Sequence, residues 1–261
     1  MKKKIILTST VCSYKTLCII LKMTIDNNSH FRFPPKKLKP EQVIVFNAIT
    51  YSVDICEITY DRLYNELIKF SKNPSSKNEN YPKIFADVWT IISNATIFMN
   101  LITRHFNLET DEPMLSELSK AKKLRNSYQH IDERISEVLT LNDLPMYGSL
   151  SWIRNIPNSN RFQQFMLYSG VFTNHKESVG GQMIIPTMEI GIDEIDEIIF
   201  ESITKQNQNF PKVTISIKKL ISDIQSWIEH FEKQINKQLE SYGRMKRHNT
   251  NLFFQINGHR E

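Results

Sequence analysis

The chain has 261 residues, of which 40% are hydrophobic and 23% charged, so it can bury one good core and bulk disorder is excluded. Its formal net charge of +5 is mildly basic, which is compatible with a polyanionic partner without requiring one. Only seven glycines occur and no glycine-rich phosphate-binding string is found, which disfavours folds that hold nucleotides on such loops.

Residues 1–23 superficially resemble a signal peptide, because a basic start precedes an apolar run. Lys15 interrupts that run, no small-residue cleavage site follows, and the apolar stretches are too short to span a bilayer, so we expect no membrane association. A natural start at Met23, a short packed strand and a disordered tail remain open alternatives. Residues 24–39 contain Asn27-Asn28, Pro34-Pro35 and three lysines, a composition typical of an exposed linker.

Three long helices are predicted next. Pro40 is favoured at a helix start, and apolar side chains recur at three- and four-residue steps over 41–71. A second helix, 81–106, is apolar around much of its circumference, which suits the most buried member of a bundle. A third, 115–141, follows the acidic residues and proline of 111–113 and carries one buried stripe.

The character of the chain changes after Leu141. Short segments rich in β-branched and aromatic residues predict an antiparallel sheet of three to five strands: 150–154, 162–172, 183–185, 195–203 and 213–217. The segment 195–200 fits a helix equally well. Beyond Ser216, which is a suitable N-cap, another long amphipathic helix is predicted, followed by a basic tail from Gly243.

The predicted fold class is therefore mainly α, a bundle of four long helices with an antiparallel β-rich insertion before the last long helix. We divide the chain by role into an N-terminal extension and linker, a helical bundle, a β-rich insertion, and a C-terminal helix with its basic tail: 1–39, 40–141, 142–217 and 218–261. One compact domain with a β appendage is favoured over two independent domains.

The cysteine, histidine and carboxylate side chains show no spacing typical of disulfide bonds or metal sites. The three cysteines form no C-x-x-C pair, which indicates a reducing compartment, and we expect the cytoplasm. The histidines lack metal-ligand spacing, so no metal or cofactor is expected. Four clustered carboxylates have no complementary ligands nearby: Asp193, Glu194, Asp196 and Glu197. The three tryptophans fit core positions, and two Lys- and Arg-rich clusters, Lys36-Lys37-Lys39 and Arg244-Lys246-Arg247, fit solvated charge or contacts to an RNA backbone.

The polar side of the third helix carries the string Arg125-Asn126-Ser127-Tyr128-Gln129-His130. Arg125 offers a permanent planar cation that suits phosphate oxygens, and His130 can exchange a proton near neutral pH. Asn126 adds an amide able to orient a phosphate, a hydroxyl or the imidazole. These groups suffice for RNA cleavage without a metal, through attack of the ribose 2′-hydroxyl on the neighbouring phosphorus.

Helical geometry complicates this hypothesis, because Arg125 and His130 lie ~140° apart on an ideal helix. They can meet at one phosphate if the helix is distorted, if the arginine reaches around, or if a second copy of the chain places its own motif opposite. The alternative interpretation is an ordinary surface arginine and histidine that pair with neighbours such as Asp132 and Glu133.

The string resembles the R-x4-6-H motif of HEPN domains (higher eukaryotes and prokaryotes nucleotide-binding), in which a polar residue, frequently Asn, follows the arginine. The flanking residues 125–135 also resemble those of uncharacterised bacterial members, and the resemblance covers about 41–141 and the last helix. It does not account for the strands. The resemblance implies a helical bundle whose members often dimerise into a composite endoribonuclease site and act in phage defence or toxin–antitoxin systems. It implies catalytic roles for Arg125 and His130 and a supporting role for Asn126.

The functional hypothesis from the sequence is thus a homodimeric, metal-independent endoribonuclease of HEPN type, bacterial and cytoplasmic. Its expected partners are RNA, a second copy and an antitoxin or defence-system protein. The first alternative is a non-catalytic helical module that binds a nucleotide, RNA or a protein. The second is a purely structural dimerisation protein.

Overall fold

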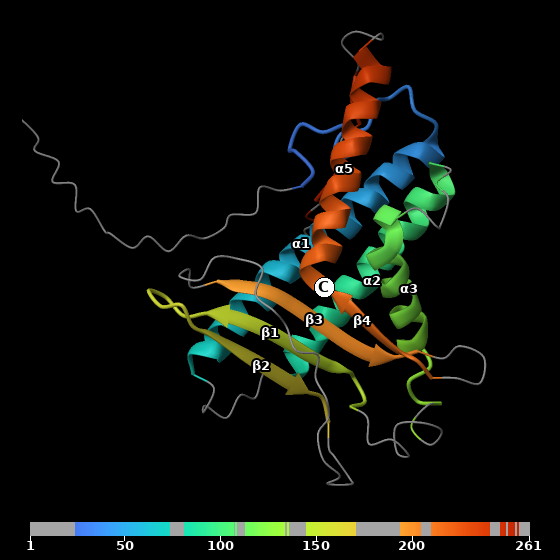
Figure 1. Ribbon diagram of the computed structural model, residues 1–261. Coiled ribbons are helices and arrows are strands. Elements are labelled where there is room, and N and C mark those ends of the chain that lie inside the picture. The colour runs from blue at the N-terminus through green and yellow to red at the C-terminus, as the bar shows by residue number, and fades with distance from the viewer. Residues whose placement is uncertain are drawn as a thin grey trace, which may run out of the picture.

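The computed structural model describes residues 24–73, 81–106, 108, 113–133, 135, 145–170, 194–204, 210–240, 246–248, 250–253 and 255. Within them, four α-helices and a short 3-10 turn accompany four strands (Figure 1): α1 Pro40–Lys72, α2 Tyr81–His105, η1 Pro113–Leu115, α3 Ser116–Tyr128, β1 Ser149–Asn155, β2 Phe162–Tyr168, β3 Ile195–Ile203, β4 Lys212–Ser216 and α5 Ile217–Glu240. The predicted combination of long helices and an antiparallel sheet is confirmed.

The first helix, α1, begins at Pro40 as predicted, and the Gln42 side chain accepts a hydrogen bond from the Lys39 backbone N–H at 3.0 Å. That bond satisfies a backbone donor just before the helix, where no intrahelical acceptor is available. One face of α1 is buried along its whole length, from Val45 to Ser71.

The prediction that residues 24–39 form an exposed linker is wrong. Ile25 and Phe31 are buried in the main core, and the Phe31 ring lies 4.8 Å from the Phe46 ring of α1, centroid to centroid. Arg32 donates two hydrogen bonds of 2.7 Å to the two carboxylate oxygens of Asp54. A bidentate arginine pair fixes geometry as well as charge, so this segment is fastened along α1.

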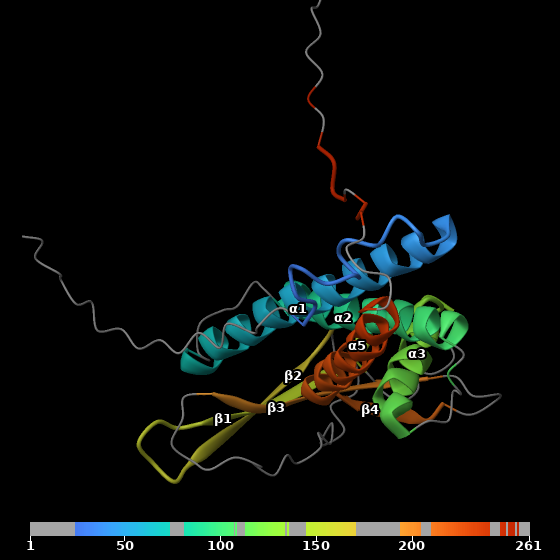
Figure 2. The ribbon, with the colours of Figure 1, turned by 90° about the horizontal axis from the view of Figure 1, so that it is seen from above.

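The second helix, α2, is buried on most sides and lies between α1 and α3 (Figure 2). By length and composition α1 and α2 could each cross a membrane. However, 56% and 61% of their most apolar windows are buried inside the protein, as in the core helices of soluble proteins. This apolar character is therefore accounted for by packing and is weak evidence for a membrane.

The strands form one antiparallel sheet in the order β2-β1-β3-β4. Ser149 pairs with Tyr168 of β2 and with Glu201 of β3, which places β1 in the interior of the sheet. The strand β3 in turn pairs with β1 on one side and with β4 on the other, which excludes the helical alternative for 195–200. The predicted second strand is shorter than expected, because β2 ends at Tyr168, and the predicted strand at 183–185 lies outside the described residues.

Helices and sheet share one core. Trp152 of β1 is fully buried, donates a 2.8 Å hydrogen bond to the Ser71 hydroxyl of α1, and stacks on Phe165 of β2 at 5.3 Å. On α2, the Trp89 ring meets the Phe200 ring of β3 edge-on at 5.2 Å. The sheet is therefore a layer packed against α1 and α2, which run behind the strands in Figure 1.

The last helix, α5, follows β4 without a loop. The Ser216 hydroxyl accepts a hydrogen bond from the Lys219 N–H at 2.9 Å, so the predicted N-cap is confirmed. The same hydroxyl donates to Glu197 of β3 at 2.8 Å, which ties the helix start to the sheet. Farther on, the chain returns to the N-terminal segment, where the Lys36 N–H donates to the Lys246 carbonyl at 2.9 Å.

Candidate functional site

The candidate site lies at the C-terminal end of α3, where the helix stops earlier than the sequence predicts. The last α-helical residue is Tyr128, and the N–H groups of His130 and Ile131 donate three residues back, each at 3.2 Å. Residues 129–133 are turns, so a continuous helix over 115–141 is wrong for this part of the range. The motif therefore straddles a helix end.

Two residues inside the motif fasten this helix end to the core. The Ser127 hydroxyl is buried and donates a 2.6 Å hydrogen bond to the carbonyl of Ile203, at the end of β3. The Tyr128 ring stacks on Trp89 of α2 at 4.2 Å with an angle of 18° between the planes. Trp89 in turn donates to the Tyr147 carbonyl at 3.1 Å. The other residues of the motif, Arg125, Asn126 and His130, are therefore attached to a helix end that is fastened to the core.

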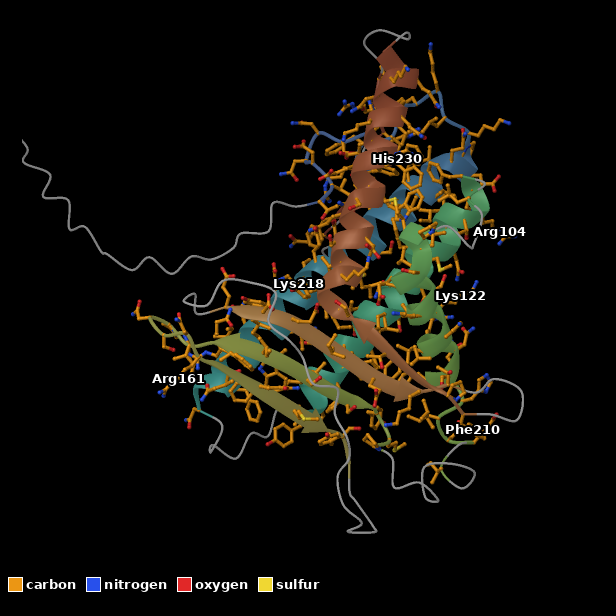
Figure 3. The ribbon with its side chains drawn as sticks, in the orientation of Figure 1. Arg104, Lys122, Arg161, Phe210, Lys218 and His230 are labelled. Carbon is orange, nitrogen blue, oxygen red and sulfur yellow. The ribbon has the colours of Figure 1, made fainter. Side chains whose placement is uncertain are left out.

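A second, smaller apolar cluster lies just beyond the helix. Ile131 packs with Met146 and Phe210 around Ile203. Figure 3 shows Phe210 beside the lower end of α3. Ile131, the apolar residue that continued the helical pattern beyond Tyr128, is therefore half-buried against this second cluster and not in the main core, which explains why periodicity alone extended the predicted helix.

His130 is exposed, with 59% of its side chain open to solvent, and its Nδ1 lies 3.3 Å from Glu133 Oε1. This contact is the neighbour pairing that the alternative interpretation expected, and such an exposed pair adds little stability. It also has a chemical consequence, because a carboxylate at Nδ1 orients the ring and leaves Nε2 for another partner.

Arg125 is half-buried and Asn126 is exposed. In the part of the chain that the structure describes, no carboxylate pairs with the Arg125 guanidinium. The tightened turn also moves His130 away from Arg125, since each residue at 3-10 spacing adds roughly 20° to the ~140° of an ideal helix. One chain alone does not bring the two groups to the same side of the helix end.

The outer face of α3 is basic. We define the α3 basic strip as Lys122, Lys123 and Arg125, which on an ideal helix spread over ~160° with Lys122 between the other two. Figure 3 shows Lys122 on this face. The carboxylate of Glu117, which precedes the strip, is buried, with Lys120 Nζ at 2.6 Å and the Ser216 N–H at 3.2 Å. The negative end of the helix dipole also favours cations here. The strip therefore suits a polyanion.

Other predicted candidates have structural roles. Asp196 is buried, and its backbone carbonyl accepts a 2.7 Å hydrogen bond from Lys218 Nζ. Glu197 accepts from the Ile198 N–H at 2.9 Å as well as from Ser216. Asp193 lies outside the described residues. Among the residues that the structure does place, no group of three or more His, Cys, Asp or Glu side chains is arranged for a metal. All three tryptophans are buried: Trp89, Trp152 and Trp227.

The two basic clusters meet in space, which the sequence analysis missed. The backbones of 34–36 and 246–248 pair with each other, which brings Lys36 beside Lys246. Arg247 donates to the Asn28 carbonyl at 2.8 Å. Burial, together with the charge of Arg247, lowers the pKa of His30 below its usual value. Such long-range pairing leaves no periodic signal in either segment.

Comparison of the chain with models of known protein families, with curated proteins and with solved structures gives no match.

Proposed function

We propose that this protein is a metal-independent endoribonuclease of HEPN type that acts through the C-terminal end of α3. The observation that supports the proposal most is the presentation of the motif. Asn126 and His130 are exposed and Arg125 is half-buried at a helix end that Ser127 and Tyr128 fasten to the core. An anchored base of this kind limits the motion of catalytic groups, which transition-state stabilisation requires.

His130 is the proton-transfer group in this proposal. With Nδ1 held by Glu133, Nε2 accepts the proton of a ribose 2′-hydroxyl as its oxygen bonds to the adjacent phosphorus. The bond from phosphorus to the 5′-oxygen breaks, and an acid protonates that leaving oxygen. The products are a 2′,3′-cyclic phosphate and a 5′-hydroxyl. General acid–base help of this kind typically contributes ~10²–10⁴-fold.

Arg125 stabilises the negative charge that gathers on the phosphoryl oxygens, and Asn126 orients the phosphate. Because Arg125 and His130 leave the helix end on different sides, the complete site takes Arg125 from one chain and His130 from a second. When the two helix ends meet at a two-fold axis, both arginines and both imidazoles line one cleft, so that one imidazole acts as base and the other as acid. We further propose a bacterial, cytoplasmic defence or toxin–antitoxin role, which rests on the motif resemblance alone.

The second candidate is a non-catalytic module that binds RNA. It is favoured by the α3 basic strip, which needs no composite site to contact phosphates. In that case His130 and Glu133 form an ordinary surface pair, and the protein retains RNA without cutting it.

The decisive experiment incubates the purified chain with mixed RNA in EDTA and compares His130→Ala with His230→Ala. His230 is an exposed histidine on α5 and provides a matched control. We expect chelator-resistant cleavage with 2′,3′-cyclic ends in the wild type and in His230→Ala, and its loss in His130→Ala. Equal cleavage by the wild type and His130→Ala removes the enzyme proposal. RNA retention without cleavage by either protein supports the module instead.

A further inference from the structure

The outward face of α1 carries an exposed apolar stripe that nothing in the candidate site uses. We define the α1 outer stripe as Ile44, Tyr51, Ile55 and Ile58, which are between 36% and 68% exposed. With the half-buried Ala48 they follow steps of four, three, four and three residues. On an ideal helix the four side chains fall within an arc of about 60° and extend over about 21 Å.

This spacing is the pattern by which one helix packs lengthwise against another. The opposite face of α1 is already occupied, since it is buried against α2 and the N-terminal segment. A helix that has satisfied its inward face and still carries regularly spaced isoleucines outward has a second face suited to a partner helix.

The C-terminal segment enlarges the surface. The Tyr51 hydroxyl donates a 2.7 Å hydrogen bond to Asn251 Oδ1, which holds that segment beside the stripe. The next two residues, Leu252 and Phe253, are 67% and 90% exposed. A large side chain has an accessible area on the order of 200 Å². The exposed fractions of these six residues therefore amount to roughly 700 Å², close to the ~800 Å² per partner of a standard interface.

We propose that the α1 outer stripe is the docking surface for a second copy of this chain, with the two α1 helices antiparallel and crossing near Tyr51. The inference does not rest on the proposed function. The antiparallel arrangement opposes the dipoles of the two helices and places Glu41, about 15 Å before Tyr51, level with the partner's Arg62, about 16 Å after it. Within each chain the Arg62 guanidinium also donates to the buried Asp87 carboxylate, and 48% of the Arg62 side chain remains exposed. Asp61 lies on the opposite flank of the stripe, away from the partner's Glu41.

The stripe and the candidate site lie on different sides of the helical layer, because α2 separates α1 from α3 (Figure 2). A dimer through the stripe therefore leaves the ends of both α3 helices accessible. The composite RNA site of the proposed function is a second and separate contact, which two chains make around a bound RNA strand, so the tests below are made without RNA. Disrupting the stripe and disrupting the motif have distinguishable consequences.

The first test measures the mass of the full chain by light scattering across roughly 1–100 µM, spanning micromolar dissociation constants. We expect a concentration-dependent dimer that Ile55→Asp converts to a monomer, since a buried charge in the contact is unfavourable. Phe162→Asp, at an exposed apolar position on β2, is the matched control and remains dimeric. A monomeric wild type, or a dimer that survives Ile55→Asp, overturns the proposal. So does a monomer that floats with phosphatidylcholine vesicles, which assigns the stripe to lipid.

The second test fixes the orientation in a background where Cys12 and Cys18 are replaced by serine. The antiparallel pair predicts that a mixture of Ile44→Cys and Ile58→Cys chains forms a mixed disulfide dimer under mild oxidation. Each variant alone should remain uncrosslinked. Crosslinking of Ile44→Cys or Ile58→Cys with itself, without the mixed species, contradicts the antiparallel arrangement.

Discussion

Helices α1 and α3 bury their inward faces in the same core but present opposite kinds of surface to solvent. The outward face of α1 is apolar over the α1 outer stripe, whereas the outward face of α3 is basic over the α3 basic strip. Core packing dictates only the inward half of an amphipathic helix. The outward halves of the two helices are free to differ. The outward half of α1 suits another helix, whereas that of α3 suits a polyanion.

The largest expected effect comes from a substitution in the hydrophobic core that supports both surfaces. Trp152 fills the core between β1 and α1, so Trp152→Ala should lower the free energy of unfolding by about 3–5 kcal/mol. Guanidinium unfolding followed by circular dichroism measures the change. Ser71→Ala, which removes the acceptor of the Trp152 hydrogen bond and the donor to the Leu67 carbonyl, should cost about 1–3 kcal/mol. Both dimerisation and RNA binding should weaken in Trp152→Ala. Loss of one alone would mean that the two surfaces have separate supports.

The second effect separates the two surfaces. Arg125→Ala should reduce RNA cleavage by about 10²–10³-fold, because the charge on the phosphoryl oxygens loses its cation. Ile55→Asp should leave cleavage close to that of the wild type and should abolish the stripe dimer. Initial rates and light scattering on the same preparations measure both properties. If Ile55→Asp also abolishes cleavage, the two contacts are coupled and the separation across α2 fails.

A smaller effect concerns the strip alone. Lys123→Ala removes an exposed cation, so RNA affinity should fall and the slope of log affinity against log salt should become shallower by about 0.7. Fluorescence anisotropy with a labelled single-stranded RNA at several salt concentrations gives this slope. Lys219→Ala on α5 is a matched control, because Lys219 already pairs with Asp223 at 2.9 Å. Equal slopes for Lys123→Ala and the wild type would exclude contact between Lys123 and phosphate.

The smallest effect lies beside the stripe, on the flank of α1 that holds the N-terminal segment. Burial raises the pKa of the Glu57 carboxyl, against the opposing effect of hydrogen bonds from Thr24. The folded state then binds this proton more tightly than the unfolded state. The stability that it contributes is present below the unfolded pKa of about 4.3 and is lost as pH rises through the folded pKa.

Glu57→Gln should therefore become more stable relative to the wild type between pH 4 and pH 7. Urea unfolding at the two pH values measures this difference. Glu229→Gln, at an exposed position of α5, should show no comparable gain. A relative stability of Glu57→Gln that does not change with pH would show that burial does not govern the Glu57 carboxyl.

Periodicity predicted the helices because each presents a continuous face to one core. The preferences of residues at helix ends placed the start of α1 at Pro40 and the Ser216 cap of α5 correctly, since both depend on local backbone chemistry. Periodicity failed after Tyr128, where Ile131 kept the helical spacing but packs against a different cluster. Composition failed for residues 24–39, where polar residues masked the burial of Ile25 and Phe31.

The candidate site was identified from residue types, but its shape was not. Sequence spacing named Arg125, Asn126 and His130, yet only the structure locates the helix end between them and the anchors Ser127 and Tyr128. Those anchors depend on partners on α2 and β3 that are distant in the chain. No local pattern encodes such contacts, so the sequence alone could not establish whether the two catalytic candidates share a side.

The backbone pairing of Lys36 with Lys246 has a consequence for the order in which the protein is made. During translation the segment before α1 emerges from the ribosome early, but its pairing partner emerges only after α5 has been synthesised. The surroundings of the first helix can therefore be completed only after α5 and residues 246–248 have been synthesised.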